Sequence, residues 1–145
     1  MKVALGVRSP VSQNAVIVGG GRVGRHTAEQ LVDHEYTVTV VEFDPETSSR
    51  LASGRIEVIE GDGTDIEVLE RAGIAEADVA AALTDDTQAN IVVCGLAREL
   101  NPDVRTLARV SEDGEQDYGH LSDVDNIVYP AAAGADVTTD RLLSE

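Results

Sequence analysis

The chain has 145 residues, 42% of them hydrophobic, which suits one globular domain with its own core rather than two domains or a disordered chain. Its formal net charge of −16, from 27 acidic and 11 basic residues, leaves no basic face to meet nucleic-acid phosphates. A single cysteine excludes an internal disulfide framework, and no apolar run approaches the roughly 18–20 residues that span a bilayer, so a cytoplasmic protein is expected.

The first 13 residues are expected to form an irregular N-terminal arm, residues 1–13, before a single domain at 14–145. They contain Pro10 and a polar Ser12-Gln13 pair, which are typical of irregular structure. Such an arm leads into the first strand; contact with a neighbouring subunit is the alternative.

The stretch 14–33, NAVIVGGGRVGRHTAEQLVD, predicts a buried strand, a glycine turn and a helix. Its glycines fit the pattern G-x-G-x-x-G at Gly19, Gly21 and Gly24. Gly19 permits the tight turn, Gly21 lets a pyrophosphate approach the backbone, and Gly24 lets the helix pack closely on its strand. The amides of the first helical turn would then face the phosphates. The motif alone does not exclude a glycine loop that only packs.

Five further strands alternate with helices along the rest of the chain. Strands are expected at 36–41, 56–59, 78–83, 104–110 and 126–129, and helices at 45–51, 66–72, 87–100, 112–121 and 130–143. This alternation predicts an α/β fold, a Rossmann-like, doubly wound, six-stranded parallel sheet with helices on both faces and right-handed crossovers.

Glu42 ends the second expected strand, 18 residues after Gly24 (42 − 24). This is close to the spacing of roughly 20 residues found for the acidic residue that binds ribose in dinucleotide sites. Its carboxylate can accept hydrogen bonds from ribose hydroxyls and would repel a 2′-phosphate, for which Phe43 and Asp44 supply no compensating cation. NAD or an adenine nucleotide is therefore favoured over NADP. The alternative for Glu42 is a solvated strand end, and Asp44 is expected to cap the next helix first and to bind a ligand second.

These stretches resemble the nucleotide-binding regulatory domain of potassium transport systems, the TrkA-N or RCK N-terminal domain. The resemblance rests on VIVGGGRVGRHTAEQL, VTVVEFDPE, IEGDGTD, LTDDTQANIVVCGLAREL and TLARV, which cover most of residues 14–110, and on VDNIVYP followed by a helix. It implies a cytoplasmic sensor of NAD(H) or ATP/ADP that controls a membrane potassium transporter or channel subunit without inserting into the membrane itself. It also implies a homodimer or higher homo-oligomer, with the helix after Pro130 as a candidate contact surface.

The resemblance further implies which residues hold the nucleotide. The glycine loop and Glu42 carry over directly, and Asp62 would contact the adenine. Thr84 and Asp85 would lie near the second nucleoside or the terminal phosphates, while Arg22 and Arg109 match basic positions of the family. The full implied set is Gly19, Gly21, Arg22, Val23, Gly24, Glu42, Asp62, Gly63, Thr84, Asp85 and Arg109.

Two alternatives stay open. The first concerns the origin of the chain, because many members of the family continue into a second regulatory domain, whereas this sequence ends at Glu145. The sequence is compatible with a free-standing subunit, with a truncated piece, and with one end of a fusion, for example with a phosphoesterase. The second alternative is a fragment of an NAD-dependent oxidoreductase. Catalysis is not expected, because there is no room for a substrate domain and no H-E-x-x-H, C-x-x-C or Walker lysine motif, and Cys94 has the surroundings of a small core residue.

The acidic residues are spread along the whole chain, and Lys2 is the single lysine. This pattern is typical of a protein that works in concentrated salt, where screening relieves the repulsion between like charges. A halophilic source is therefore expected. An ordinary acidic protein encoded by an arginine-favouring genome is the alternative.

Overall fold

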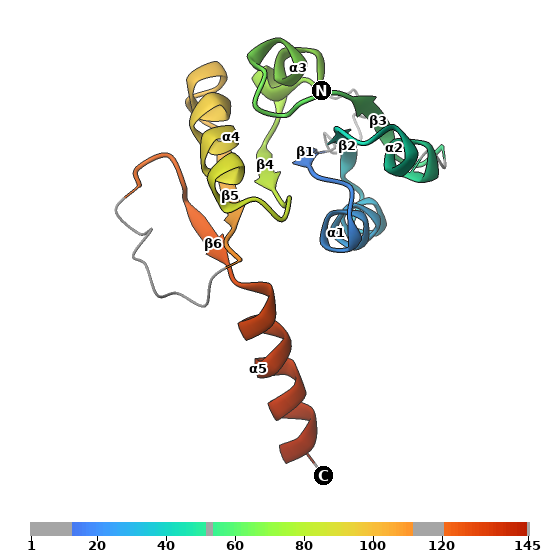
Figure 1. The fold of residues 1–145 in the computed structure, drawn as a ribbon, viewed down its shortest axis with the longest axis vertical. Helices are drawn as coiled ribbons and strands as arrows, with labels where there is room; N and C mark the ends of the chain where they lie inside the picture. Colours follow the sequence, from blue (N-terminus) through green and yellow to red (C-terminus); the bar gives the residue numbers. More distant parts are fainter. Residues whose placement is uncertain (1–12, 52–53, 112–120, 145) are drawn as a thin grey trace, which may run out of the picture.

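A computed structural model describes residues 13–51, 54–111 and 121–144 (Figure 1). In chain order the elements are β1 (Asn14–Val18), α1 (Arg22–Asp33), β2 (Thr37–Glu42), α2 (Pro45–Leu51), β3 (Glu57–Glu60), α3 (Ile66–Arg71), η1 (Ile74–Glu76), β4 (Val79–Ala82), α4 (Thr87–Leu100), β5 (Arg105–Arg109), β6 (Asn126–Val128) and α5 (Pro130–Leu143). The arm expected at 1–13 and the helix expected at 112–121 lie almost entirely outside the described residues.

All six strands form one parallel sheet in the order β3-β2-β1-β4-β5-β6, which confirms the predicted fold class. From β1 the chain first builds outward through β2 and β3, and then returns to the other side of β1 to add β4, β5 and β6. The strand order therefore reverses between β1 and β4. In open sheets of this kind, ligands bind at that reversal, outside the carboxyl ends of the strands.

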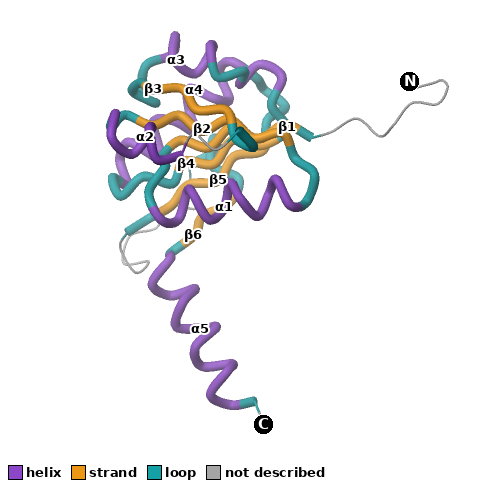
Figure 2. Tube along the Cα trace, turned by 90° about the vertical axis from the view of Figure 1, so that its right-hand side faces the viewer, coloured by secondary structure: helices purple, strands orange, loops and turns teal. Residues whose placement is uncertain are grey.

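Helices cover both faces of the sheet (Figure 2). Alternate residues of β1 face opposite ways: Ala15 and Ile17 belong to a core that includes residues of α1 and α2, while Val16 and Val18 belong to a core that includes residues of α3 and α4. Both cores consist of Val, Ile, Leu and Ala with one cysteine, and Ile17 is fully buried. Full burial of such a side chain contributes about 1.5–3 kcal/mol, so a core without large aromatic residues still stabilises the domain.

Strand β5 is shorter than its predicted range, and β2 and β3 are shifted by one residue. Val104 and Val110 flank β5 and are 2% and 0% exposed, but they lie outside the paired strand. Strands β2 and β3 keep their predicted lengths but begin and end one residue later, so Tyr36 and Ile56 precede them. An apolar run marks burial and need not coincide with the bounds of a strand, and the two limits differ by one residue at these ends.

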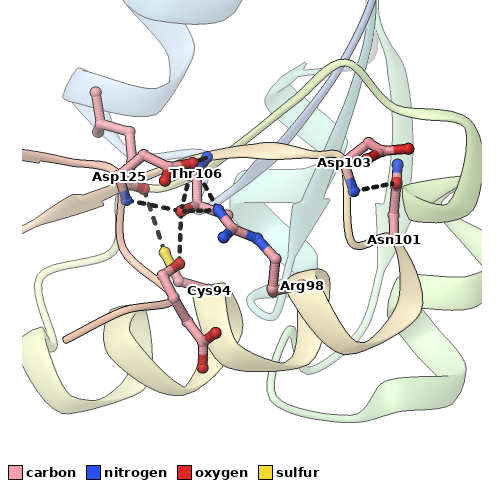
Figure 3. Close-up of polar contacts among 8 residues, drawn as sticks. Cys94, Arg98, Asn101, Asp103, Thr106 and Asp125 are labelled. Carbon is pink, nitrogen blue, oxygen red and sulfur yellow. Dashed lines mark hydrogen bonds and ion pairs between the residues drawn. The ribbon is translucent and has the colours of Figure 1, made fainter.

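A polar network fastens the segment before β6 to β5 and α4 (Figure 3). Arg98 Nη2 lies 2.6 Å from Asp125 Oδ2, which also accepts a hydrogen bond of 2.9 Å from the Thr106 amide. The Thr106 hydroxyl donates to the Asp123 carbonyl at 2.6 Å and accepts from the Asp125 amide at 3.0 Å. Cys94 lies beside this network at 1% exposure, and burial raises the pKa of its thiol to about 11. Cys94 is therefore a core residue, as expected.

Helix α5 projects away from the rest of the domain (Figures 1 and 2). None of its residues is buried, and Val137, Leu142 and Leu143 are 55%, 79% and 78% exposed. An isolated helix of this length is marginal in water, because most helical stability in proteins comes from packing an apolar face. The described part of the chain supplies no such packing to α5. Among the described helices, none is both long and apolar enough to cross a membrane.

Candidate nucleotide-binding site

A cleft of about 870 Å³ opens at the carboxyl ends of the strands, at the reversal between β1 and β4. Its volume falls within the range of small-molecule sites. Ten of the eleven residues predicted from the sequence line it, and Gly24 is the exception. The lining is Val18, Gly19, Gly21, Arg22, Val23, Val41, Glu42, Phe43, Asp44, Thr47, Gly61, Asp62, Gly63, Thr64, Leu83, Thr84, Asp85, Asp86, Ala89, Val93 and Arg109.

Close packing explains three of the four glycines in the loop between β1 and α1, because a side chain at these positions would meet neighbouring atoms. Gly19 has φ +106°, and a Cβ there would lie 2.9 Å from the Thr84 amide nitrogen. A Cβ on Gly20 would collide with Leu51, and a Cβ on Gly24 would overlap the carbonyl oxygen of Gly19. Gly24 therefore lies beneath the cleft, where it lets α1 approach the end of β1.

Gly21 is the glycine that packing does not explain. Its φ of −71° is open to any residue, and a Cβ there would meet no protein atom within 4 Å. The residue lines the cleft and is the N-cap of α1, where it offers no side-chain cap, and the first turn holds no acidic residue. The positive end of the helix is therefore not neutralised by its own first turn, an arrangement that suits a phosphate against the loop backbone.

Glu42 does more than end a strand. Its carboxylate is half-buried: Oε1 accepts a hydrogen bond of 2.6 Å from the Gly20 amide, and Oε2 accepts one of 2.8 Å from the Asp44 amide. These bonds hold the glycine loop against the end of β2. Glu42 therefore has a structural role at the end of β2, beside the ribose-binding role expected for it. Each carboxylate oxygen keeps a second lone pair, so ribose hydroxyls can still donate to it.

Asp44 and Asp62 each accept hydrogen bonds in the turn that follows them. Asp44 accepts from the Thr47 hydroxyl at 2.9 Å and from the Glu46 amide at 3.3 Å, which confirms its role as a helix cap. Asp62 Oδ1 accepts from the hydroxyl and the amide of Thr64, at 2.7 and 2.9 Å. In both residues these bonds, led by the threonine hydroxyl, lower the pKa of the carboxyl. Both side chains are therefore anions at the rim of the cleft at neutral pH.

Asn90 on α4 joins the ends of β4 and β5, and the sequence reasoning missed it. Its Oδ1 accepts from the hydroxyl and the amide of Thr84, at 2.7 and 3.1 Å. Its Nδ2 donates to the carbonyls of Thr84 and Arg109, at 2.9 and 2.8 Å. Asn90 is fully buried. The available signal was a polar residue among the apolar residues that α4 turns toward the sheet.

The charges of the cleft are unevenly divided. Its cations are Arg22, which is exposed, and Arg109, whose Nη1 lies 3.5 Å from the Leu83 carbonyl. The buried Nε of Arg109 has no hydrogen-bond partner in the described structure. The carboxylates of the lining are Glu42, Asp44, Asp62, Asp85 and Asp86. Within the described residues, no group of three or more His, Cys, Asp and Glu could hold a metal ion.

Phe43, Thr47 and Thr64 also line the cleft and were not among the predicted residues. Phe43 is the single phenylalanine of the chain, directly follows Glu42 and is 73% exposed. An exposed aromatic ring beside an expected ribose-binding acid was the signal that the sequence offered.

Known proteins share both the sequence pattern and the fold. The Trk system potassium uptake protein TrkA homolog of Pyrococcus abyssi is 41% identical over 104 residues, which cover 70% of this chain and 45% of that protein. A TrkA homolog of Methanothermobacter thermautotrophicus is 37% identical over 122 residues, which cover 83% of this chain and 56% of that protein. The chain therefore spans about half the length of these relatives.

Solved structures share the fold. The TrkA-N domain of the Escherichia coli inner membrane protein ybaL has a TM-score of 0.78 at 22% identity, covering 92% of this chain and 98% of that chain. GsuK bound to ADP has a TM-score of 0.73 at 25% identity, covering 90% of this chain and 34% of that chain. The sequence model of the TrkA-N domain matches residues 15–130, most of the sequence. The chain belongs to the TrkA-N domain family.

Proposed function

We propose that this chain is a nucleotide-sensing regulatory subunit or domain, which binds NAD(H) or ATP/ADP in the cleft and controls a membrane potassium channel or transporter. The observation that carries the proposal is Gly21, a cleft-lining glycine at the start of α1 that no protein neighbour requires. The relatives support the wider role, since one is a potassium uptake protein and GsuK has been solved bound to ADP.

In this proposal the adenosine moiety occupies the half of the cleft formed by β1, β2 and β3. Its ribose hydroxyls donate to Glu42, and the phosphates accept from the first amides of α1 beside Arg22. The adenine lies between Phe43 and the turn at Asp62. The other half, with Thr84, Asp85 and Arg109, takes the part that differs between the ligands, a nicotinamide nucleoside or a terminal phosphate.

The ligand would act by shifting a population. A nucleotide across the reversal touches the glycine loop, which Glu42 holds, and the β4–β5 ends, which Asn90 holds. It can favour one subunit arrangement only as far as it binds that arrangement more tightly than the other. The domain would then act on a membrane partner from the cytoplasmic side, without inserting into the membrane itself and without catalysing a reaction.

Titration calorimetry with NAD, NADH, ATP and ADP, with absorbance followed at 340 nm, tests this function. The wild type should bind one or more of these nucleotides and leave NADH unoxidised in the presence of carbonyl substrates. Glu42→Gln should weaken binding by roughly 10- to 100-fold, because charge-assisted bonds to ribose contribute on the order of 1.5–3 kcal/mol each.

The matched control is Glu60→Gln, which removes the same charge from the neighbouring position on β3, outside the cleft lining. It should bind as the wild type does. Steady consumption of NADH by the wild type would overturn the sensor and favour an oxidoreductase fragment. Undiminished binding by Glu42→Gln would show that the ribose lies elsewhere.

We also propose that the protein assembles as a homodimer or higher homo-oligomer through α5, whose apolar side chains find no partner in the described chain. Light scattering at tens of micromolar in high salt should give at least a dimer mass. Leu142→Asp with Leu143→Asp should shift the protein toward monomer, since each change places a charge in a buried contact. Val92→Asp, at an exposed apolar position on α4, should keep the wild-type mass. A monomeric wild type would contradict this assembly.

A halophilic source is the further part of the proposal, and it rests on the net charge of −16 with one lysine. The melting temperature should rise steeply between roughly 0.1 and 2 M KCl, because the Debye length falls from about 10 Å to a few ångströms and the repulsion between carboxylates fades. Thermal melts across a KCl series would measure the rise. A melting temperature indifferent to salt would mean that the acidic surface is no adaptation.

A further inference from the structure

A second, smaller cleft of about 250 Å³ lies between the start of α1 and the end of α2. Gly21, Arg22 and Thr47 line both clefts, so the two adjoin at the glycine loop. The remaining lining of the small cleft is Gly20, Arg25, Arg50 and Leu51. Three of its seven lining residues are therefore arginines, in a chain that has 11 basic residues against 27 acidic ones.

The charge of these arginines is poorly compensated by the protein. Arg22 and Arg25 form no ion pair with any described residue, and Arg25 is half-buried. Arg50 reaches Glu46 at 3.9 Å, but both side chains are largely exposed, at 73% and 82%, and such a pair contributes little. By contrast, Arg98 pairs with its carboxylate at 2.6 Å. Like charges gathered at one cleft repel each other unless an anion joins them.

The small cleft lies directly beside the group that we place at the ribose. Gly20 belongs to this lining, and its amide donates to Glu42 at 2.6 Å. The carboxylates of Glu42 and Asp44 line the main cleft and not the small one. Guanidinium groups present planar pairs of N–H donors that match phosphate oxygens. The small cleft thus has the chemistry of a phosphate site.

We propose that this small cleft binds one phosphate group in addition to the phosphates held on α1. The group is carried either on the ribose of the bound nucleotide, as the 2′-phosphate of NADPH is, or by free inorganic phosphate. The sequence disfavoured NADP because no cation stands next to Glu42 in the chain, whereas the fold gathers three arginines from α1 and α2 at a cleft that adjoins the cleft lined by Glu42. A phosphate carried by a bound nucleotide requires the function proposed above, whereas binding of free inorganic phosphate does not.

Calorimetry at constant ionic strength distinguishes the two sources. NADH, NADPH and inorganic phosphate are each titrated into the full chain, and phosphate also into the chain saturated with NADH. The test variant is Arg25→Gln with Arg50→Gln. The matched control is Arg71→Gln with Arg105→Gln, which makes the same change of charge at two exposed arginines outside both clefts. Equal melting temperatures for both double variants and the wild type establish that the fold is kept.

If the nucleotide carries the phosphate, NADPH binds the wild type no more weakly than NADH, and the test variant weakens NADPH by about tenfold or more while NADH changes by less than about threefold. If free phosphate is the ligand, one phosphate binds beside NADH and the test variant loses it. The control leaves either result unchanged. The proposal is overturned if NADPH and phosphate bind the test variant as they bind the wild type, or if neither binds the wild type. A wild type that fails to bind NADH refutes the proposed function, and the phosphate titration still decides this site.

Discussion

Gly21→Asp is expected to abolish nucleotide binding and to leave the fold intact. The backbone at Gly21 has φ −71°, and its added Cβ would meet no protein atom within 4 Å, so the domain can accept the side chain. The new carboxylate would stand where the phosphates are proposed to lie and would occupy the positive end of α1 itself. We expect affinity for ADP and NADH to fall by at least about 100-fold. Titration calorimetry measures the loss, and a melting curve verifies the fold.

Two variants separate the site from general effects of charge or bulk. Gln30→Asp adds the same charge to an exposed position further along α1 and should bind as the wild type does. Gly21→Ala adds a methyl group without charge and should lose less affinity than Gly21→Asp. Wild-type affinity in Gly21→Asp would show that the phosphates do not lie on this loop. A lowered melting temperature would show that Gly21 has a packing role after all.

Gly24→Ala is expected to destabilise the domain, although it belongs to the same motif. Its Cβ would overlap the carbonyl oxygen of Gly19, which is backbone and cannot rotate away, so α1 has to move off the end of β1. Overpacking of this kind costs about 1–3 kcal/mol. For a domain of this size the melting temperature should fall by roughly 5–10 °C, and thermal melts followed by circular dichroism measure the change.

Gly134→Ala is the matched control, because Gly134 lies within α5 and its Cβ would meet nothing within 4 Å. Alanine favours a helix over glycine by about 1 kcal/mol, so this variant should be neutral or slightly stabilising. The same chemical change thus has opposite signs at two helical glycines. If Gly24→Ala melts with the wild type, the contact between α1 and β1 is looser than the structure shows.

Features of the chain that depend on local chemistry could be predicted from the sequence. The alternation of strands with helices appears as changes of apolar period, and together with the rules for crossovers it gave the six-stranded parallel sheet. The glycine loop was predicted from the spacing of Gly19, Gly21 and Gly24, and the acidic strand end from the position of Glu42. Both border the same cleft in the structure. Each of these signals can be recognised within a short stretch of the sequence, because turn and helix geometry are local.

The tertiary structure alone decided which distant groups meet. In the sequence, Asn90 is a polar residue on an otherwise apolar helix face. In the fold, Thr84 after β4 and Arg109 of β5 supply its four hydrogen bonds. Arg25 and Arg50 share a cleft because α1 and α2 lie on the same face of the sheet and pack on the same core. Glu42 holds the glycine loop through an amide 22 positions earlier. The partners of a buried polar group or of a charge depend on how whole helices and strands pack together. The apolar periodicity of one segment does not specify which other segments it will contact.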